Sequence, residues 1–114
     1  MAFAQSLTIV AAEPIPPFAP VTFNGRVANS ANLTHYDRVA GFNGLQAAGI
    51  GLRVELINNG EIYNEHAIWT ANRQILLNGK QLSQTPPTVG FIQILGIAKD
   101  SKTMIVYFGV PIRL

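Results

Sequence analysis

Short apolar runs alternate with turn signals along most of the chain. From residue 21 onward, Gly, Asn or Pro interrupts the hydrophobic stretches every 8–12 residues or so, which is typical of an all-β sandwich or barrel. No helix of about ten or more residues is predicted. The predicted strands cover residues 7–10, 21–23, 26–28, 38–42, 52–56, 61–63, 75–77, 80–82, 91–98 and 103–108.

Two Asn-Gly pairs give the most specific turn signals. Asn24-Gly25 and Asn78-Gly79 each separate two short apolar runs, and Asn-Gly is strongly favoured in tight hairpin turns. A polar turn at residues 99–102 joins the last two predicted strands. In the segment 52–56, alternation with period two predicts that Leu52, Val54 and Leu56 share one face.

The segment 1–20 has a different character. Four prolines fall within seven residues, at positions 14, 16, 17 and 20. Proline fixes its own φ and donates no hydrogen bond, so this segment is predicted to be an extended N-terminal arm, with a β domain at 21–114. Ile15 and Phe18 have little local structure to bury them. Two interpretations stay open: the arm wraps its own domain, or it reaches a neighbour.

The composition indicates a surface that is covered by other proteins. Of the 114 residues, 48% are hydrophobic, and only 12% are charged, against about 25% in typical domains. A solitary soluble domain usually carries more charge on its surface. The net charge is +2, and the eight basic residues are scattered singly, which disfavours nucleic-acid binding.

The absence of cysteine excludes disulfides, thiolate metal sites and cysteine nucleophiles. We also expect no signal peptide and no membrane span, since no apolar stretch reaches about 18 residues. The chain is therefore expected to be soluble and made in the cytoplasm.

Candidate chemistry is weak. His35 and Asp37 would share one face of a strand, and Ser30 or Thr34 would have to supply a nucleophile. Glu65-His66, with Glu61 nearby, is a poor metal motif. A catalytic pair of carboxylates for glycoside hydrolysis, distant in sequence and brought together only in the fold, is a further alternative that we favour less. We predict a non-enzymatic protein with no cofactor and no metal.

The glycines at 41, 44, 49 and 51 are clustered, but no Lys-Ser or Lys-Thr pair follows, so we interpret them as turns or close backbone approaches. Trp69, Tyr63 and Tyr107 are interpreted as core or interface residues in preference to sugar-stacking platforms.

The segment 74–108 resembles a module of virion proteins from tailed bacteriophages. The resemblance is carried by a strand, a Gly turn, the sequence Leu-Ser-Gln-Thr-Pro-Pro at 82–87, a Gly-Phe-Ile-Gln strand at 90–93, and a last strand after a polar turn. It covers about residues 28–114 and is specific only from Ile75. In physical terms, Pro86-Pro87 would end ladder pairing, Gly90 would allow an unusual φ, and Gln93 would share a face with Phe91 and Leu95.

The resemblance implies a structural protein of the virion. A short chain with an apolar arm is most similar to capsid decoration or cementing proteins, which bind the major capsid protein and often form trimers. The alternatives are a tail, baseplate or fibre component and, more remotely, a carbohydrate-binding β module. On this interpretation the interface residues are Ile15 and Phe18 in the arm and Trp69 on the body.

Overall fold

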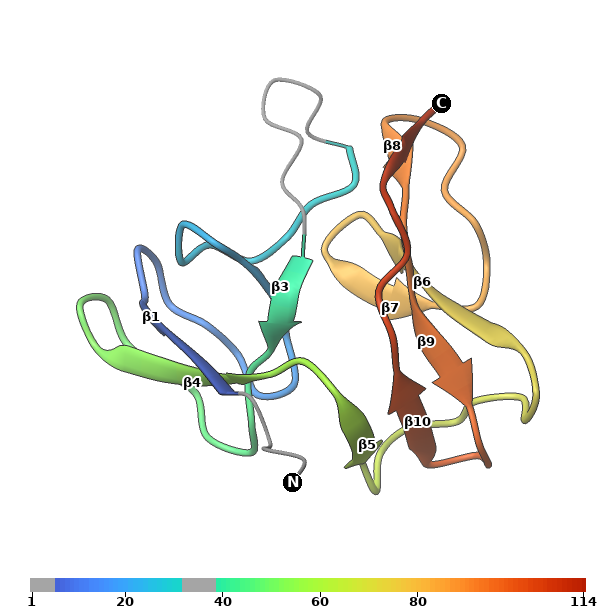
Figure 1. The fold of residues 1–114 in the computed structure, drawn as a ribbon, viewed down its shortest axis with the longest axis horizontal. Helices are drawn as coiled ribbons and strands as arrows, with labels where there is room; N and C mark the ends of the chain where they lie inside the picture. The colour runs from blue at the N-terminus through green and yellow to red at the C-terminus, as the bar shows by residue number, and fades with distance from the viewer. Residues whose placement is uncertain (1–5, 32–38) are drawn as a thin grey trace, which may run out of the picture.

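The computed structural model describes residues 6–31 and 39–114, and these residues fold into an all-β structure with antiparallel strands and no helix (Figure 1). The all-β prediction is confirmed. Its strands are β1 (Ser6–Val10), β2 (Pro20–Thr22), β3 (Val39–Phe42), β4 (Arg53–Ile57), β5 (Gly60–Tyr63), β6 (Gln74–Asn78), β7 (Gln81–Ser83), β8 (Phe91–Ile92), β9 (Ile94–Ala98), β10 (Thr103–Val106) and β11 (Ile112–Arg113).

The first sheet has four strands in the order β1-β4-β3-β2. In β4, Val54 and Leu56 point into the core, whereas Arg53 and Glu55 are exposed, as expected from alternation. The prediction that Leu52 shares the face of Val54 and Leu56 is wrong, because those two side chains are buried and that of Leu52 is not. Leu52 precedes the strand and is 58% exposed, and its carbonyl accepts a hydrogen bond from the Ala11 N–H.

The second sheet has five strands in the order β5-β10-β9-β6-β7, and a short pair, β11-β8, extends beside it. The predicted turn at Asn78-Gly79 joins β6 to β7. Gly79 takes a φ of 61° as the first central residue of this two-residue turn, the position where a type II′ hairpin requires glycine.

Two hydrophobic clusters hold the sandwich-like arrangement together. The larger cluster lies between the two main sheets, and it includes Val39 and Phe42 from β3 together with Leu77, Leu95 and other residues of the second sheet. The smaller cluster lies between the first sheet and the chain that follows β1.

Gln93 links the two main sheets inside the larger cluster. Its side chain is fully buried; Oε1 accepts from the Val39 N–H (3.3 Å) and Nε2 donates to the Gly109 carbonyl (3.2 Å). Phe91, Gln93 and Leu95 are all buried, so the predicted shared face is confirmed.

Gly90 has the unusual φ expected of it, at 87°. A Cβ at this position would lie 1.8 Å from the Ser30 carbonyl oxygen, so only glycine fits. The Phe91 N–H donates to the same carbonyl, which holds the start of β8 against the loop at residue 30.

The described part of the proline-rich segment does not form a projecting arm. Residues 6–10 are β1, which pairs with β4 along its full length. Ile15 is 1% exposed and forms a bridge with Ala48, and the chain then runs into β2. Of the two interpretations of this segment, the structure shows the one in which it wraps its own domain. This segment contacts the rest of the described chain on both sides of the predicted boundary at residue 20, through Ile15 with Ala48 and through β2 with β3.

Candidate functional site

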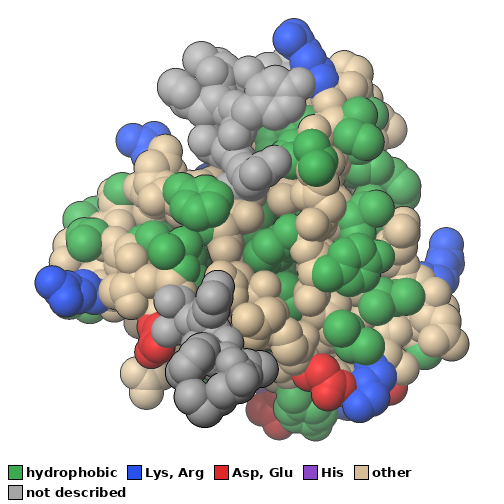
Figure 2. Space-filling view, viewed as in Figure 1, with side chains coloured by type: hydrophobic (Ala, Val, Ile, Leu, Met, Phe, Trp, Pro, Cys, Tyr) green, Lys and Arg blue, Asp and Glu red, His purple; other side chains and the backbone are tan. Residues whose placement is uncertain are grey.

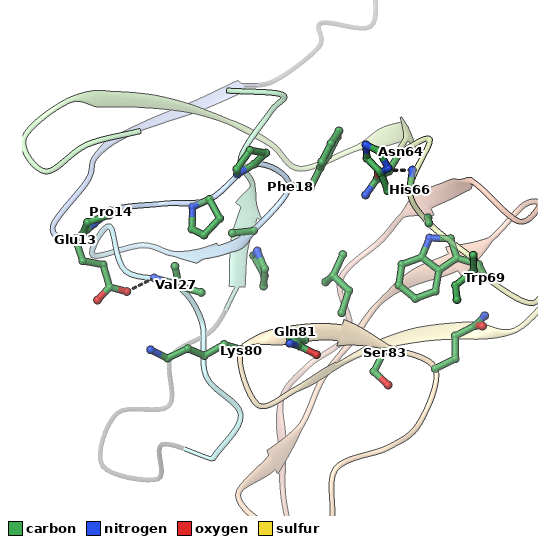
Figure 3. A pocket seen from close by; sticks show the side chains of 18 residues that line it. Glu13, Pro14, Phe18, Val27, Asn64, His66, Trp69, Lys80, Gln81 and Ser83 are labelled. Carbon is green, nitrogen blue, oxygen red and sulfur yellow. Dashed lines mark hydrogen bonds between the residues drawn. The ribbon is translucent and has the colours of Figure 1, made fainter. Parts of the chain in front are cut away.

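An open groove of about 820 Å³ lies between the proline-rich segment and the second sheet (Figure 3). Glu13, Pro14 and residues 16–20 form one wall, residues 80–84 form the opposite wall, and part of the loop at 64–69 closes one end. We call this feature the docking groove. The prolines of its first wall fix their own φ and carry no N–H, which limits backbone pairing along this wall.

Phe18, Trp69 and Leu82 converge at the floor of the docking groove. All three are partly buried and pack against the larger core cluster. Beneath them lies a small gap of about 20 Å³, which Phe42 and Met104 line from the core side. The floor of the groove is therefore apolar and incompletely filled.

Phe18 holds an unfavourable backbone conformation on the groove wall. Its φ is 60°, and a bulky side chain rarely adopts this region. The Phe18 N–H donates to the Gly44 carbonyl (3.1 Å), and the N–H of the next residue, Ala19, donates to the Pro16 carbonyl (3.3 Å). These contacts fix a tight turn that directs the phenyl ring into the molecule.

Two of the three predicted interface residues therefore meet in one site, and the third does not. Phe18 and Trp69 both line the docking groove. Ile15 is a core residue with 1% exposure, so in this fold its side chain offers no surface to a partner. Sequence reasoning missed Leu82 as a groove residue. The hairpin at 75–82 was predicted, but its position at a sheet edge could not be.

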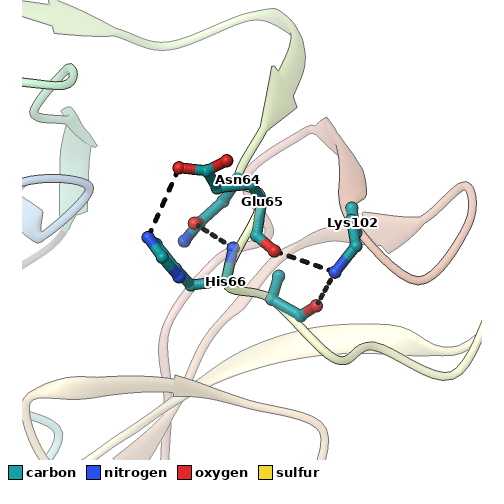
Figure 4. Close-up of polar contacts among 5 residues, drawn as sticks. Asn64, Glu65, His66 and Lys102 are labelled. Carbon is teal, nitrogen blue, oxygen red and sulfur yellow. Dashed lines mark hydrogen bonds and ion pairs between the residues drawn. The ribbon is translucent and has the colours of Figure 1, made fainter.

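The polar end of the groove carries Glu65 and His66, which were considered as a metal motif (Figure 4). The His66 Nε2 lies 3.5 Å from the Glu65 Oε1, and both side chains are largely exposed. The loop is held through its backbone, since the Lys102 Nζ donates to the carbonyls of Glu65 (2.8 Å) and Ala67 (3.3 Å).

No group of three or more His, Cys, Asp or Glu side chains that could hold a metal comes together among residues 6–31 and 39–114. Glu61 lies away from His66 and pairs with Lys99 at 2.7 Å. Of the candidate nucleophiles, Ser30 is 1% exposed, and its Oγ accepts from the Gly79 N–H at 2.7 Å, which is a structural contact. Thr34, His35 and Asp37 lie outside the described residues.

A second surface is the outward face of the five-stranded sheet. Ile105 pairs with Ile97 on one side and with Glu61 on the other, and alternation places Tyr63 and Tyr107 on this same face. Ile105, Tyr63 and Tyr107 are exposed, and Ile97 is half-buried. We call Tyr63, Ile97, Ile105 and Tyr107 the outer sheet face.

Exposed hydrophobic residues are numerous beyond this face. Ten further large hydrophobic residues of the described chain are exposed, including Leu45 at 77% and Ile68 at 90%. In Figure 2, hydrophobic side chains spread over the half of the view that contains β8–β10, while most charged side chains stand at the rim. This distribution is typical of a surface that contacts other proteins.

The fold and its surfaces define a class: a small antiparallel β protein with a groove of apolar floor and an outer sheet that exposes apolar residues. No family model matches the chain, and comparison with curated proteins and with solved structures finds no similar protein. The described residues also contain no helix of the length and hydrophobicity needed to cross a membrane.

Proposed function

We propose that the protein is a structural component of a tailed-bacteriophage virion, a capsid decoration or cementing protein that binds across subunits of the head. One observation carries the proposal. The outward face of the five-stranded sheet exposes Tyr63, Ile105 and Tyr107 beside the Glu61–Lys99 ion pair, whereas its inner face is covered by the rest of the chain. A sheet of this kind gains stability when a second protein covers its free face.

The interface would lie on the outer sheet face. Removal of apolar surface from water contributes about 25 cal/mol per Å² buried. Because each decoration protein would meet several capsid subunits, modest contacts would add through multivalency. The low charge of the chain fits this role, since few ionised groups would have to lose water on binding.

A pair of matched double variants tests the interface. Ile105→Thr with Tyr107→Thr removes apolar area from the outer sheet face and keeps a residue that favours strands. Leu45→Thr with Ile50→Thr removes exposed apolar area from a loop. We expect the first pair to abolish self-association and binding to particles and the second to leave both intact. Analytical ultracentrifugation and co-sedimentation with heads measure this, and an equal effect of the two pairs would contradict the proposal.

The location on the particle is tested separately. Immunogold labelling of particles from the phage that encodes the chain is expected to mark the head. Label on the tail or fibres would instead support the alternative that the protein is a tail, baseplate or fibre component. Such a component would use the same sheet face as its interface. Intact particles without label would overturn the virion assignment. In solution or on heads, we expect three copies per assembly unit.

A carbohydrate-binding function is the second candidate, because Phe18 and Trp69 both line the docking groove. Aromatic rings can stack on sugars. A glycan array screened with the protein would reveal such binding, and an array without a hit would remove this candidate.

A further inference from the structure

We propose that the docking groove is a strand-accepting site. It binds an extended segment of a partner polypeptide, which pairs with the free edge of β7 and places an apolar side chain against Trp69. An acidic group of the same segment would lie near Lys80. This inference concerns a surface separate from the outer sheet face and does not depend on the virion assignment.

The first argument is the way β7 faces the groove. Five consecutive residues, 80–84, line the cavity. In a strand, successive side chains point to opposite faces of the sheet, so a cavity over one face would contact alternate residues. Contact with every residue in turn means that the cavity lies along the edge of the strand. β7 is the edge strand of its sheet.

The second argument is the hydrogen-bonding capacity of that edge. The Leu77 N–H donates to the Gln93 carbonyl at 3.2 Å, away from β7. In an antiparallel pair, hydrogen-bonded and non-hydrogen-bonded positions alternate, so Leu77 and its partner Leu82 form a non-hydrogen-bonded pair. The N–H and carbonyl of Leu82 therefore point outward, where a new strand would meet them.

The opposite wall offers the occupant few partners for backbone hydrogen bonds. Prolines at 14, 16, 17 and 20 have no N–H, so this wall offers the occupant few backbone donors. The Glu13 Oε1 accepts the Val27 N–H at 2.8 Å. With one wall that can pair and one that offers few donors, the groove suits a single extended chain.

The floor determines the kind of side chain. The gap beneath Phe18, Trp69 and Leu82 is lined mainly by carbon and leads toward the core. At about 20 Å³ the gap has room for little more than a methyl group, so an apolar side chain of the occupant would pack on Trp69 and Leu82 above it, whereas a polar group would lose water without a partner. The strained backbone of Phe18 supports this assignment, since such strain is concentrated at binding sites.

The charge at the rim points to an acidic group in the occupant. Lys80 lines the groove and forms no ion pair within the described residues. A carboxylate of the incoming segment would complement it and fix the register of the strand.

The polar lining favours a peptide over a sugar. Gln84 is already engaged on both sides of its amide, since Nε2 donates to the Thr70 carbonyl (2.8 Å) and Oε1 accepts from the Thr70 N–H (2.7 Å). The Asn64 Oδ1 accepts from the His66 N–H. Lys80, Gln81 and His66 still offer polar groups at the rim, but the outward N–H and carbonyl of Leu82 supply the paired backbone donor and acceptor that a peptide matches and a sugar does not.

The test uses a displayed library of random linear peptides of about ten residues, a length that spans β7 and its flanks at about 3.4 Å per residue. Peptides are selected on the intact protein. Trp69 is the only tryptophan in the chain, so its fluorescence reports directly on the groove. We expect the selected peptides to show alternating apolar residues with an acidic residue, to shift the Trp69 emission to shorter wavelength, and to slow exchange of the Leu82 amide hydrogen.

Charge reversal supplies the matched control. Lys80→Glu is expected to weaken the binding of a selected peptide by about tenfold or more. Arg113→Glu, an exposed residue of β11 outside the groove, is expected to leave it unchanged. The proposal is overturned if no peptide is selected, if selected peptides leave Trp69 and the Leu82 amide unaffected, or if a glycan shifts the Trp69 emission while peptides do not.

Discussion

Gln93 and Phe18 each occupy a position that is unfavourable for their residue type, and their contacts compensate for this. Gln93 is a polar side chain in the larger hydrophobic cluster, and its hydrogen bonds satisfy the Val39 N–H and the Gly109 carbonyl. Phe18 adopts a backbone conformation that suits glycine, and its ring packs against the core. The face of Gln93 could be predicted from alternation along 91–95. The φ of Phe18 could not, because it depends on how the segment closes onto Gly44.

Gln93→Leu is expected to destabilise the fold although it keeps the volume of the side chain. Each buried backbone group left without a partner costs about 1–3 kcal/mol. Urea unfolding followed by circular dichroism measures the change. Gln74→Leu, on an exposed position of β6, is the control. Equal stability of Gln93→Leu and the wild type would show that the two contacts are dispensable.

Phe18→Gly and Phe18→Ala separate backbone strain from packing. Both lose the ring, but only alanine keeps a Cβ at a φ of 60°, which costs about 1–2 kcal/mol. We therefore expect the glycine variant to be the more stable of the two in thermal unfolding. An alanine variant of equal or greater stability would mean that this backbone relaxes once the ring is removed.

At the scale of elements, most strand positions were predictable and strand partners were not, although the strand predicted at 26–28 is only an isolated bridge at Val27. Alternation and turn signals located the strands at 53–57, 74–78 and 103–106 closely. The partners came only from the structure: β1 crosses to β4, and β5 pairs with β10. The predicted strand at 91–98 is divided into β8 and β9 at Gln93, and β11 was missed because two residues carry no periodic pattern.

The turn between β9 and β10 illustrates a local signal with a measurable effect. The Asp100 carboxylate accepts from the N–H groups of Lys102 and Thr103, both at 2.9 Å. The contact with Lys102, followed by the contacts with Thr103, lowers the pKa of Asp100 below its usual value. The folded protein therefore binds this proton less readily than the unfolded chain.

Asp100→Asn is expected to reduce stability at neutral pH. A depressed carboxyl pKa contributes stability that is complete above the unfolded pKa of about 3.9 and is lost as pH falls through the folded value. The difference between wild type and variant should accordingly shrink below about pH 4. Thermal unfolding between about pH 2.5 and 7 measures it. A pH-independent difference would assign the effect to the amide itself, and Glu55→Gln controls for loss of a charge.

At the scale of the whole molecule, the low charge and the exposed apolar residues both indicate one property, a surface suited to being covered by other proteins. The composition predicted a covered surface, and the structure shows two places where apolar residues lie together, the docking groove and the outer sheet face, with other exposed apolar residues dispersed beyond them. The sequence could not separate these surfaces, because residues 18, 69 and 82 converge only in the fold.

The salt response of particle binding follows from this property. Apart from the Glu61–Lys99 ion pair beside it, the outer sheet face is apolar, so binding should weaken only modestly between low salt and about 0.5 M NaCl, where charge interactions are screened. Sulfate should strengthen it, because this ion favours burial of apolar surface. Co-sedimentation in a salt series measures both responses. A steep loss of binding with NaCl would indicate that ion pairs hold the interface.

The pairing of β5 with β10 also affects how the protein is made. Gly60 can pair only after Val106 has been synthesised, and Ser6 only after Ile57 has been synthesised, so neither main sheet can form before then. Such non-local pairing is slow, in the range of milliseconds to seconds. During translation, β5 would leave the ribosome well before its neighbour in the sheet is synthesised. Newly made chains would thus keep unpaired strands for a time, and chaperones that shield such strands should raise the yield of folded protein.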